Sequence, residues 1–253
     1  MFFKKDKLDV KIYKTRDEMG KAASEDIAVA IKALLSQKEE INMIFAAAPS
    51  QNDMLLHLCE RDDIEWERIN AFHMDEYIGL RPDAPQCFSN FLKKYIFDLK
   101  PFKSVNCINA AASSPEEECK RYSGLLKEYP VDIVCMGIGE NGHIAFNDPH
   151  VADFNDKALV KPVSLDEICR MQQVNDGCFA SIDEVPKWAL TLTVPALMNA
   201  TYNFCVVPAS TKANAVKRTV EGEINEECPA TILRQKDNAI LYCDADSSAL
   251  LNK

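Results

Sequence analysis

The sequence predicts one α/β domain built around a mostly parallel β-sheet, with helices on both faces of that sheet. Short apolar runs of strand-like composition alternate with stretches of helical periodicity along the chain. The length of 253 residues and the apolar share of 47% are enough for one large hydrophobic core. No internal repeat, low-complexity tract or Pro/Gly/Ser-rich linker interrupts the chain. A single domain over residues 1–253 is therefore a simpler interpretation than two small domains.

The N-terminal half contains three predicted strands and four predicted helices. The first helix is the clearest, because its apolar residues, from Met19 to Leu34, recur at intervals of three and four residues. The expected elements are, in order, a strand at 9–13, a helix at 17–35, a strand at 41–47, a helix at 53–60, a strand at 68–74, and helices at 89–98 and 115–129.

The C-terminal half contains four predicted strands, one helix between the last two of them, and an irregular excursion. The strands are expected at 131–136, 189–194, 202–207 and 238–243, and the helix at 212–221. The stretch from about 150 to 184 fits the alternation least well, because it has polar turns and only one short helical signal at 165–174. A long excursion between two strands is often an active-site lid, and we interpret it as one.

Charge and apolar patterning exclude several classes of partner. The formal net charge of −10 at pH 7 argues against nucleic-acid binding, which needs a basic face, but leaves a small anionic ligand open. The longest apolar runs, such as 41–48, are too short to cross a bilayer, so no membrane partner is expected. The N-terminus lacks the apolar core and cleavage site of a secretory signal, which predicts a cytoplasmic protein.

The ten cysteines are scattered, and no Cys-x-x-Cys pair occurs. Several of them, such as Cys135 and Cys205, lie in apolar strand-like runs, where a free cysteine acts as a small hydrophobic residue. The pattern predicts reduced thiols and argues against a structural zinc. We expect no metal and no cofactor.

A glycine-rich segment, Gly137-Ile-Gly-Glu-Asn-Gly-His143, follows the strand expected at 131–136. Its spacing, Gly-x-Gly-x-x-Gly, is also that of a dinucleotide-binding turn. That turn belongs to the first strand and helix of its domain, whereas this segment lies past mid-chain and Pro149 leaves no room for a long helix. We interpret it instead as a loop whose glycines, including Gly139 and Gly142, permit tight turns and close approach to a ligand.

The same loop presents His143 between Asn141 and Asp148. Histidine titrates near neutral pH and can carry a proton, and a neighbouring carboxylate can fix its tautomer and raise its pKa. The alternative is a turn that happens to contain a histidine.

Two adjacent acids, Asp75 and Glu76, follow the strand expected at 68–74. Adjacent side chains of an extended chain point in opposite directions, so the two acids should have different roles. One could face the cleft as a base while the other caps a helix or forms an ion pair. Taken alone, such a pair is more simply explained as solvated.

Two further strand ends carry residues suited to phosphate. Ser50, Asn52 and Asp53 are good N-cap residues for the helix expected at 53–60, and Lys212 lies where the helix expected at 212–221 begins. A helix N-terminus with hydroxyl groups and a lysine favours an anion. A plain helix cap and a solvated lysine are the alternatives. The carboxyl ends of parallel strands meet at one edge of a sheet, which is where these segments should lie together.

Together these segments resemble the glucosamine-6-phosphate deaminase/isomerase family, which shares its fold with 6-phosphogluconolactonases. The resemblance spans most of the chain and rests on five segments: the strand and turn at 44–53, Met74-Asp-Glu-Tyr-Ile-Gly-Leu80, Gly137 to Pro149, Ala189-Leu-Thr-Leu-Thr-Val194, and 210–222. Lactonases typically continue the histidine loop with Thr-Ala-Ser-Leu-Phe-Pro and lack Met-Asp-Glu-Tyr. The deaminase branch is therefore the better match.

The resemblance implies a modified Rossmann-like fold and the conversion of glucosamine-6-phosphate, or a related hexosamine phosphate, to a ketose phosphate and ammonia. By resemblance, His143 opens the pyranose ring and Asp75 moves a proton between C2 and C1. The expected substrate-binding residues are Ser50, Gln51, Glu76, Gly139, Gly142, Arg170 and Lys212, with Arg170 a candidate for the family's lid arginine. Family members are often oligomers, so the resemblance also allows a homo-oligomer.

Three features depart from the family pattern. The family usually has aspartate where this chain has Asn141, and glutamate where it has Asp148. The family's phosphate loop is rich in Gly and Thr, whereas 46–51 has no glycine. Two alternatives to a deaminase follow: a lactonase or other sugar-phosphate isomerase that uses the same histidine, and a non-catalytic sugar-phosphate sensor.

Overall fold

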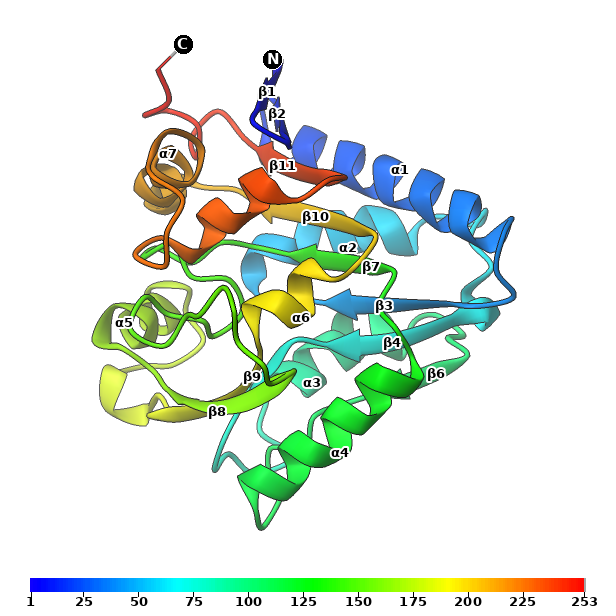
Figure 1. Cartoon of the computed structure of the whole chain (residues 1–253), viewed down its shortest axis with the longest axis vertical. Helices are drawn as coiled ribbons and strands as arrows, with labels where there is room; N and C mark the ends of the chain where they lie inside the picture. The colour runs from blue at the N-terminus through cyan, green and yellow to red at the C-terminus, as the bar shows by residue number, and fades with distance from the viewer. Residues whose placement is uncertain (253) are drawn as a thin grey trace.

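The computed structural model describes residues 1–252 and has a central eight-stranded sheet (Figure 1). Its strand order is β1-β2-β11-β10-β7-β3-β4-β6, and only the β1–β2 pair is antiparallel. The strands are β1 (Phe2–Lys5), β2 (Leu8–Ile12), β3 (Ile41–Phe45), β4 (Ile69–His73), β6 (Ser104–Asn106), β7 (Ile133–Met136), β10 (Tyr202–Val207) and β11 (Ala239–Cys243). The predicted mostly parallel sheet is confirmed.

A second, smaller sheet was not predicted from the sequence. It is antiparallel, with the order β5-β9-β8, and consists of β5 (Asp75–Tyr77), β8 (Val160–Ser164) and β9 (Trp188–Leu192). Strand β8 lies inside the stretch interpreted as a lid, so only part of that stretch is irregular. The pairing of β5 with β9 holds the two acids that follow β4, because Asp75 lies opposite Thr191 and Glu76 opposite Leu190.

Helices cover both faces of the main sheet, as predicted. One apolar core lies between the sheet and α1, α2 and α3, and the other lies between the sheet and α4, α6 and α7. The helices are α1 (Arg16–Leu35), α2 (Asn52–Cys59), α3 (Phe88–Leu92), α4 (Pro115–Glu128), α5 (Glu167–Asn175), α6 (Val194–Met198) and α7 (Ala213–Glu221).

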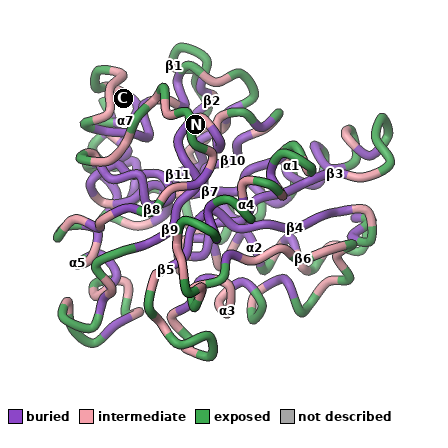
Figure 2. Tube along the Cα trace, turned by 60° about the horizontal axis from the view of Figure 1, so that its bottom comes forward, coloured by how far each residue is buried: buried purple, intermediate pink, exposed green. Residues whose placement is uncertain are grey.

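The two faces follow from the side-chain alternation of the strands. In β3, Met43 and Phe45 contribute to the first core and Ile44 to the second, and in β7 Cys135 and Val134 divide in the same way. Figure 2 shows the central strands buried along their length, with exposed residues confined mostly to loops and outer helix faces.

Short helical turns connect several elements. The helix expected at 89–98 consists of α3 followed by a π-helical segment, Lys93–Phe97. The 3₁₀ turns are Pro49–Gln51, Trp66–Arg68, Ile182–Glu184, Ser210–Lys212 and Pro229–Gln235. Two of them, at 49–51 and 210–212, directly precede α2 and α7 and tighten the first turns of the predicted anion-binding helices.

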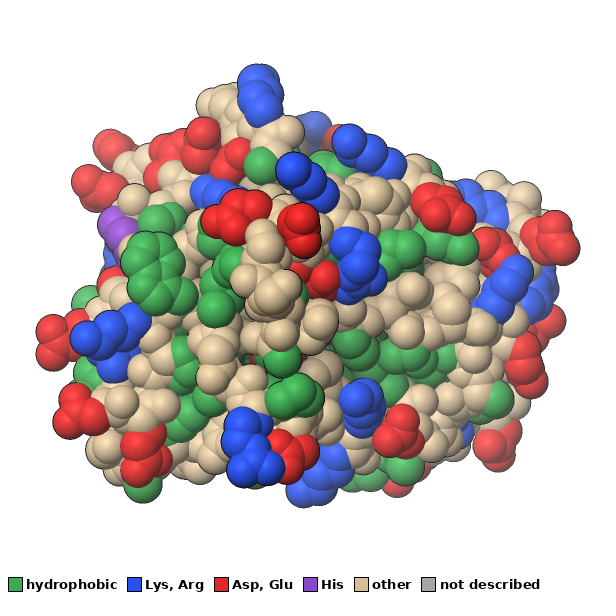
Figure 3. Space-filling view, turned by 90° about the horizontal axis from the view of Figure 1, so that it is seen from below, with side chains coloured by type: hydrophobic (Ala, Val, Ile, Leu, Met, Phe, Trp, Pro, Cys, Tyr) green, Lys and Arg blue, Asp and Glu red, His purple; other side chains and the backbone are tan. Residues whose placement is uncertain are grey.

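The surface agrees with the charge pattern of the sequence. On the face seen in Figure 3, acidic and basic side chains are interspersed and no basic stripe crosses that face. Among the described residues, no helix is both long and apolar enough to cross a membrane. All ten cysteines are free.

Helix α1 packs closely on α2, and Gly20 makes this approach possible. The side chain of Thr15 caps α1 by accepting a hydrogen bond from the backbone N–H of Glu18. A Cβ atom added to Gly20 would lie 2.7 Å from the Cβ of Asp53 and 2.9 Å from the backbone of Met54. The two helix backbones must therefore separate if residue 20 carries a side chain.

Gly20→Ala should lower the free energy of unfolding by about 1–3 kcal/mol, because the added methyl group overpacks the α1–α2 contact. Gly124→Ala is the matched control, since Gly124 is an exposed glycine within α4 and its added Cβ would meet no atom within 4 Å. That control should stabilise the protein by up to about 1 kcal/mol through helix propensity. Urea unfolding measures both changes, and equal effects of the two substitutions would contradict the packing assigned to Gly20.

Candidate active site

The parallel strands β10, β7, β3 and β4 are neighbours, and the loops after their carboxyl ends line one pocket. Ser50 follows β3, Asp75 follows β4, Gly139 and His143 follow β7, and Lys212 follows β10. All five residues line this pocket. The expectation that these sequence segments meet at one edge of the sheet is confirmed.

The histidine loop folds back on itself as a tight turn. The backbone N–H of Gly142 donates to the carbonyl of Gly139, and the N–H of Gly139 donates to the carbonyl of His143. Gly142 has a φ of +92°, a conformation that favours glycine. A Cβ atom at Gly139 would lie 2.1 Å from the imidazole of His143, so the ring occupies space that only glycine leaves free. No helix follows between 144 and 159, so the loop lacks the helix N-terminus of a dinucleotide-binding turn.

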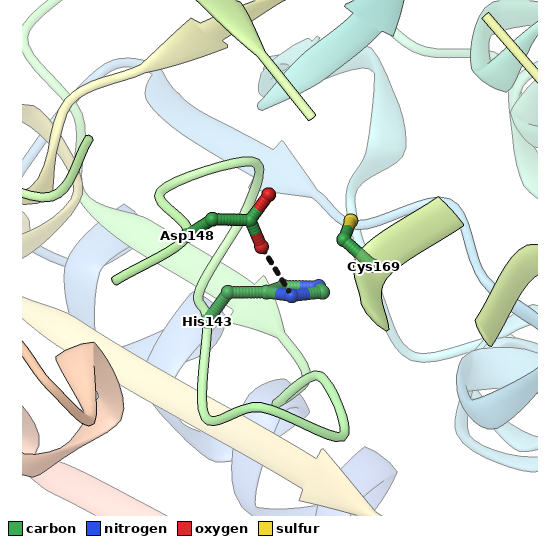
Figure 4. Close-up of side chains that lie close together, drawn as sticks. All are labelled: His143, Asp148 and Cys169. Atoms are coloured by element: carbon green, nitrogen blue, oxygen red, sulfur yellow. Dashed lines mark ion pairs between the residues drawn. The ribbon is translucent and has the colours of Figure 1, made fainter. Parts of the chain in front are cut away.

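The ring of His143 is held from its Nδ1 side by two side chains. Nδ1 lies 2.8 Å from Oδ1 of Asn141. It also lies 3.0 Å from Oδ1 of Asp148, the ion pair drawn in Figure 4. Because both neighbouring atoms are acceptors, we assign the Nδ1 proton of the neutral ring to this side. Nε2 has no hydrogen-bond partner among the described residues and is free to exchange a proton with a ligand.

Asp148 stays charged although it is fully buried. Burial acts to raise the pKa of its carboxyl group, but hydrogen bonds from His143, Asn141 and the backbone of Asp166 act against it, and the net result is a pKa below the usual value. A buried carboxylate beside Nδ1 stabilises the protonated imidazole. Asp148 thus lies beside His143 at the position where the family usually has the longer glutamate.

Asp75 has the opposite electrostatic environment. Its side chain is buried, and no described residue donates a hydrogen bond to its carboxyl oxygens. Burial raises its pKa well above the usual value, and the nearby Glu76 adds to the shift. A carboxyl group whose charged form is destabilised in this way is a stronger base than an exposed aspartate.

Glu76 faces away from the pocket, although it was predicted to bind substrate. Its carboxylate accepts hydrogen bonds from the backbone N–H groups of Tyr77, Phe88 and Ser89, the last two in the first turn of α3. Burial raises the pKa of this carboxyl group, and these hydrogen bonds act in the opposite direction. The expectation of different roles for the two adjacent acids is met, with Glu76 as the residue that binds a helix N-terminus.

Lys212 is the only Lys or Arg side chain among the described residues that line the pocket. It is 5% exposed, and its burial lowers the pKa of the ammonium group, while the charges of Asp176 and Glu140 act to raise it. Its position in the turn that precedes α7, in a pocket that Ser50 also lines, suits an anionic group of the ligand.

Two other predicted binding residues, Gln51 and Gly142, do not line the pocket. Gln51 uses its side-chain amide on the hydroxyl of Ser50 and the carbonyl of Val206, at 3.0 and 3.1 Å. The α-carbon of Gly142 faces Cys228, whose Sγ would lie 2.5 Å from an added Cβ. Gln51 and Gly142 thus contact residues outside the pocket and help to hold its loops in place.

Arg170, the candidate lid arginine, also points elsewhere. Its guanidinium donates to the backbone carbonyls of Ile182 and Val185, and it fastens α5 to the following segment. The side chains that α5 places in the pocket are Gln172 and Gln173, which were not predicted. The sequence predicted that these two residues lie on a helix about one turn beyond Arg170. It did not predict which face of that helix lines the pocket.

Two groups of side chains have ligand atoms close enough for a metal ion, and they share one residue. His143, Asp148 and Cys169 form one group, and Asp148, His150 and Asp166 form the other, each with ligand atoms within 4.8 Å of one another. Figure 4 shows Cys169 on α5 beside the His143–Asp148 pair. Each carboxylate oxygen of Asp148 already accepts a hydrogen bond, one from Asn141 and the other from the backbone of Asp166.

Asp75→Asn should stabilise the protein at pH 8. The raised pKa means that ionised Asp75 costs stability at high pH. This cost is absent below the unfolded-state pKa near 4, grows as pH rises from there towards the folded-state value, and is complete above it. Asparagine avoids this cost, so the gain in Tm should shrink as pH falls from 8 towards 4. Thermal unfolding across this range measures it. Asp183→Asn, which removes an exposed acid from residues 150–184, is the control, and a pH-independent difference for Asp75→Asn would contradict the assignment.

Comparison with known protein sequences gives a consistent result. The sequence model of the glucosamine-6-phosphate isomerase/6-phosphogluconolactonase family matches residues 14–242. A glucosamine-6-phosphate deaminase of Bacillus cereus is 32% identical over 246 residues, which cover 97% of this chain and 90% of the relative. A glucosamine-6-phosphate deaminase of Bacillus anthracis shows the same identity and coverage.

Solved structures show the same relationship. A monomeric glucosamine-6-phosphate deaminase superposes with a TM-score of 0.86 at 28% identity, over 95% of this chain and 99% of that protein. The 6-phosphogluconolactonase of Thermotoga maritima superposes with a TM-score of 0.77 at 19% identity, over 94% of this chain and 100% of that protein. The second likeness shows a shared fold.

Proposed function

The chain belongs to the glucosamine-6-phosphate isomerase/6-phosphogluconolactonase family of enzymes, and from this premise we propose that it is an amino-sugar phosphate deaminase/isomerase. The substrate would be glucosamine-6-phosphate or a related hexosamine phosphate, and the products the ketose phosphate and ammonia. The observation that carries the proposal is one pocket that holds a hydrogen-bonded histidine, a buried aspartate with a raised pKa, and a lysine.

The first step assigned to this pocket is ring opening by His143. Nε2 exchanges a proton with the ring oxygen and with the C1 hydroxyl, so that the C1–O bond of the pyranose breaks and a C1 aldehyde forms. The imidazolium that exists during this exchange is stabilised by Asp148 on its Nδ1 side. Asn141 holds the same nitrogen and orients the ring.

The second step needs a base that takes a proton from carbon, and Asp75 has the properties of one. Its carboxylate removes the C2 proton, and the released electron pair forms a double bond between C1 and C2. The π pair of the C1 aldehyde moves to its oxygen, which takes up a proton, and the product is an enolamine with a hydroxyl group at C1. Return of the proton to C1 gives an imine at C2, and water then replaces nitrogen at C2 to give the ketose and ammonia. The raised pKa of Asp75 brings its basicity closer to that required for proton transfer from carbon at neutral pH.

Two side chains on different strand ends divide the acid–base work. His143 is presented after β7 and Asp75 after β4, with β3 between these strands. This separation lets one ligand receive proton transfer at oxygen and at carbon without rotation. Lys212 and Ser50 would bind the phosphate, which fixes the distance of C1 and C2 from the two catalytic groups.

A lactonase is the second candidate, because the likeness to solved 6-phosphogluconolactonases covers nearly the whole chain. Hydrolysis of a lactone needs a histidine to activate water, but it needs no base that abstracts a proton from carbon. The buried Asp75 therefore favours the deaminase. A non-catalytic sensor is disfavoured because the relatives are enzymes and both acid–base groups face the pocket.

Incubation with glucosamine-6-phosphate and its epimers should release ammonia, measured by a coupled glutamate dehydrogenase assay. Asp75→Asn and His143→Gln should each lower kcat by about 10²–10⁴-fold, because each removes a general acid–base group. His57→Gln is the control, since His57 lies on α2 outside the pocket. No ammonia from any hexosamine phosphate would exclude the proposal, and hydrolysis of 6-phosphogluconolactone that survives Asp75→Asn would favour the lactonase.

Lys212→Met should raise KM for the phosphorylated substrate by about 30-fold, which corresponds to about 2 kcal/mol for the loss of one partner of a buried charge pair. Turnover of the same amino sugar without phosphate should change little. Lys217→Met is the control, because Lys217 lies on the same helix α7 and pairs with Glu221 at the surface. An equal loss for the phosphorylated and unphosphorylated sugars would show that Lys212 does not bind the phosphate.

A further inference from the structure

The side-chain amide of Asn141 is the centre of a network that joins the histidine loop to α5. Its Oδ1 accepts from the backbone N–H of His143 at 2.9 Å and lies 2.8 Å from Nδ1 of the same residue. Its Nδ2 donates to Oδ1 of Asp148 at 2.9 Å and to Oδ2 of Asp166 at 3.0 Å. The backbone donor at one end and the carboxylates at the other fix the orientation of the amide.

Asp166 takes part in this network from the first turn of α5. It is the N-cap of that helix, and its Oδ1 accepts from the backbone N–H of Cys169. Its own backbone N–H donates to Oδ2 of Asp148 at 3.3 Å. Asp166 thus caps the helix that carries Gln172 and Gln173 into the pocket. It also forms hydrogen bonds with Asn141 and Asp148, the two residues whose side chains hold His143.

We propose that Asp166 is a positioning residue for His143 that acts through Asn141, and that this partnership requires asparagine rather than aspartate at position 141. An amide has two donors and two acceptor sites, and all four are used here. An aspartate at 141 has no donor, so it would lose both bonds to the neighbouring carboxylates and add a third negative charge beside them.

Carboxylates dominate the surroundings of residue 141, but other charged groups also face the network. Arg218 of α7 donates to the backbone carbonyl of Asn141 at 3.1 Å, away from the side-chain amide. The titratable and charged groups around the network are His143, Asp148, His150, Asp166, Cys169 and Arg218. No lysine or arginine forms an ion pair with Asp148 or Asp166 among the described residues, so a third carboxylate would be poorly balanced.

The inference rests on the proposed function for its kinetic test, which is a double-mutant cycle of Asn141→Asp and Asp166→Asn. Asparagine is as good an N-cap as aspartate, so Asp166→Asn removes the charge and retains the helix cap. Asp183→Asn, made alone and together with Asn141→Asp, is the matched control for charge on residues 150–184.

We expect the effect of Asp166→Asn on kcat/KM to change sign with the residue at position 141. Asn141→Asp should lower kcat/KM for amino-sugar phosphate at pH 7.5 by about 10–100-fold, as is typical when a partner that orients a catalytic group is lost. Asp166→Asn alone should also lower kcat/KM, because two amide NH₂ groups then face each other. In the Asn141→Asp background the same substitution should raise kcat/KM about 10-fold, because the new amide donates to the new carboxylate. The pH at which kcat/KM is half-maximal should move with Asn141→Asp and return in the double variant, which a purely structural role of α5 would not produce.

Thermal unfolding tests the inference without turnover. A third carboxylate at 141 would have a folded-state pKa above its unfolded value near 4, so it destabilises the protein at pH 8 and less as pH falls towards 5. The Tm deficit of Asn141→Asp should follow this course and shrink when Asp166→Asn is added. If the wild type releases no ammonia, the proposed function fails while this second cycle still decides the inference. Additive effects of the two substitutions in both measurements would overturn it.

Discussion

The parallel arrangement of β10, β7, β3 and β4 is the constraint on which the site depends. Adjacent strands lie about 4.8 Å apart, so the loops after four neighbouring carboxyl ends stand within reach of one small ligand. Each loop contributes one kind of group, and none of the four would form a site alone. The antiparallel pairing of β5 with β9 adds a second constraint, because it fixes which of the two acids after β4 faces the pocket.

The burial of two charged side chains in the pocket changes their acid–base properties and, at the same time, destabilises the folded protein. Asp75 and Lys212 carry opposite charges, and burial shifts both pKa values towards the neutral form. Each shift is a cost to the folded state at neutral pH. The same desolvation makes Asp75 a stronger base and strengthens the attraction of Lys212 for an anion. The large apolar cores on both faces of the sheet allow the protein to tolerate this local instability.

Most of the fold could be predicted from the sequence because burial on both sheet faces leaves a clear pattern of apolar runs and helical spacing. Strands β1 and β6 of the main sheet and β5 and β8 of the second sheet were missed, whereas β9 was predicted. Strand β8 contains a lysine and a proline and pairs only with β9, which is distant in the sequence. Asp75 and His143 could be predicted as pocket residues because they follow strong strand signals. The direction of a side chain such as Glu76, Gln51 or Arg170 depends on which backbone groups lie nearby in the fold, and no local pattern records this.

The position of α5 gives a physical explanation for the departure at position 141. In the family pattern a carboxylate at 141 is expected beside the histidine. In this chain, Asp166 places its carboxylate next to position 141 from α5, and an amide stands between it and Asp148. Asn141 therefore supplies what a second carboxylate cannot, a pair of donors that join two acids on different segments. The orientation of His143 consequently depends on the position of α5, which also brings Gln172 and Gln173 to the pocket. One set of hydrogen bonds therefore holds both the imidazole ring and this part of the pocket wall.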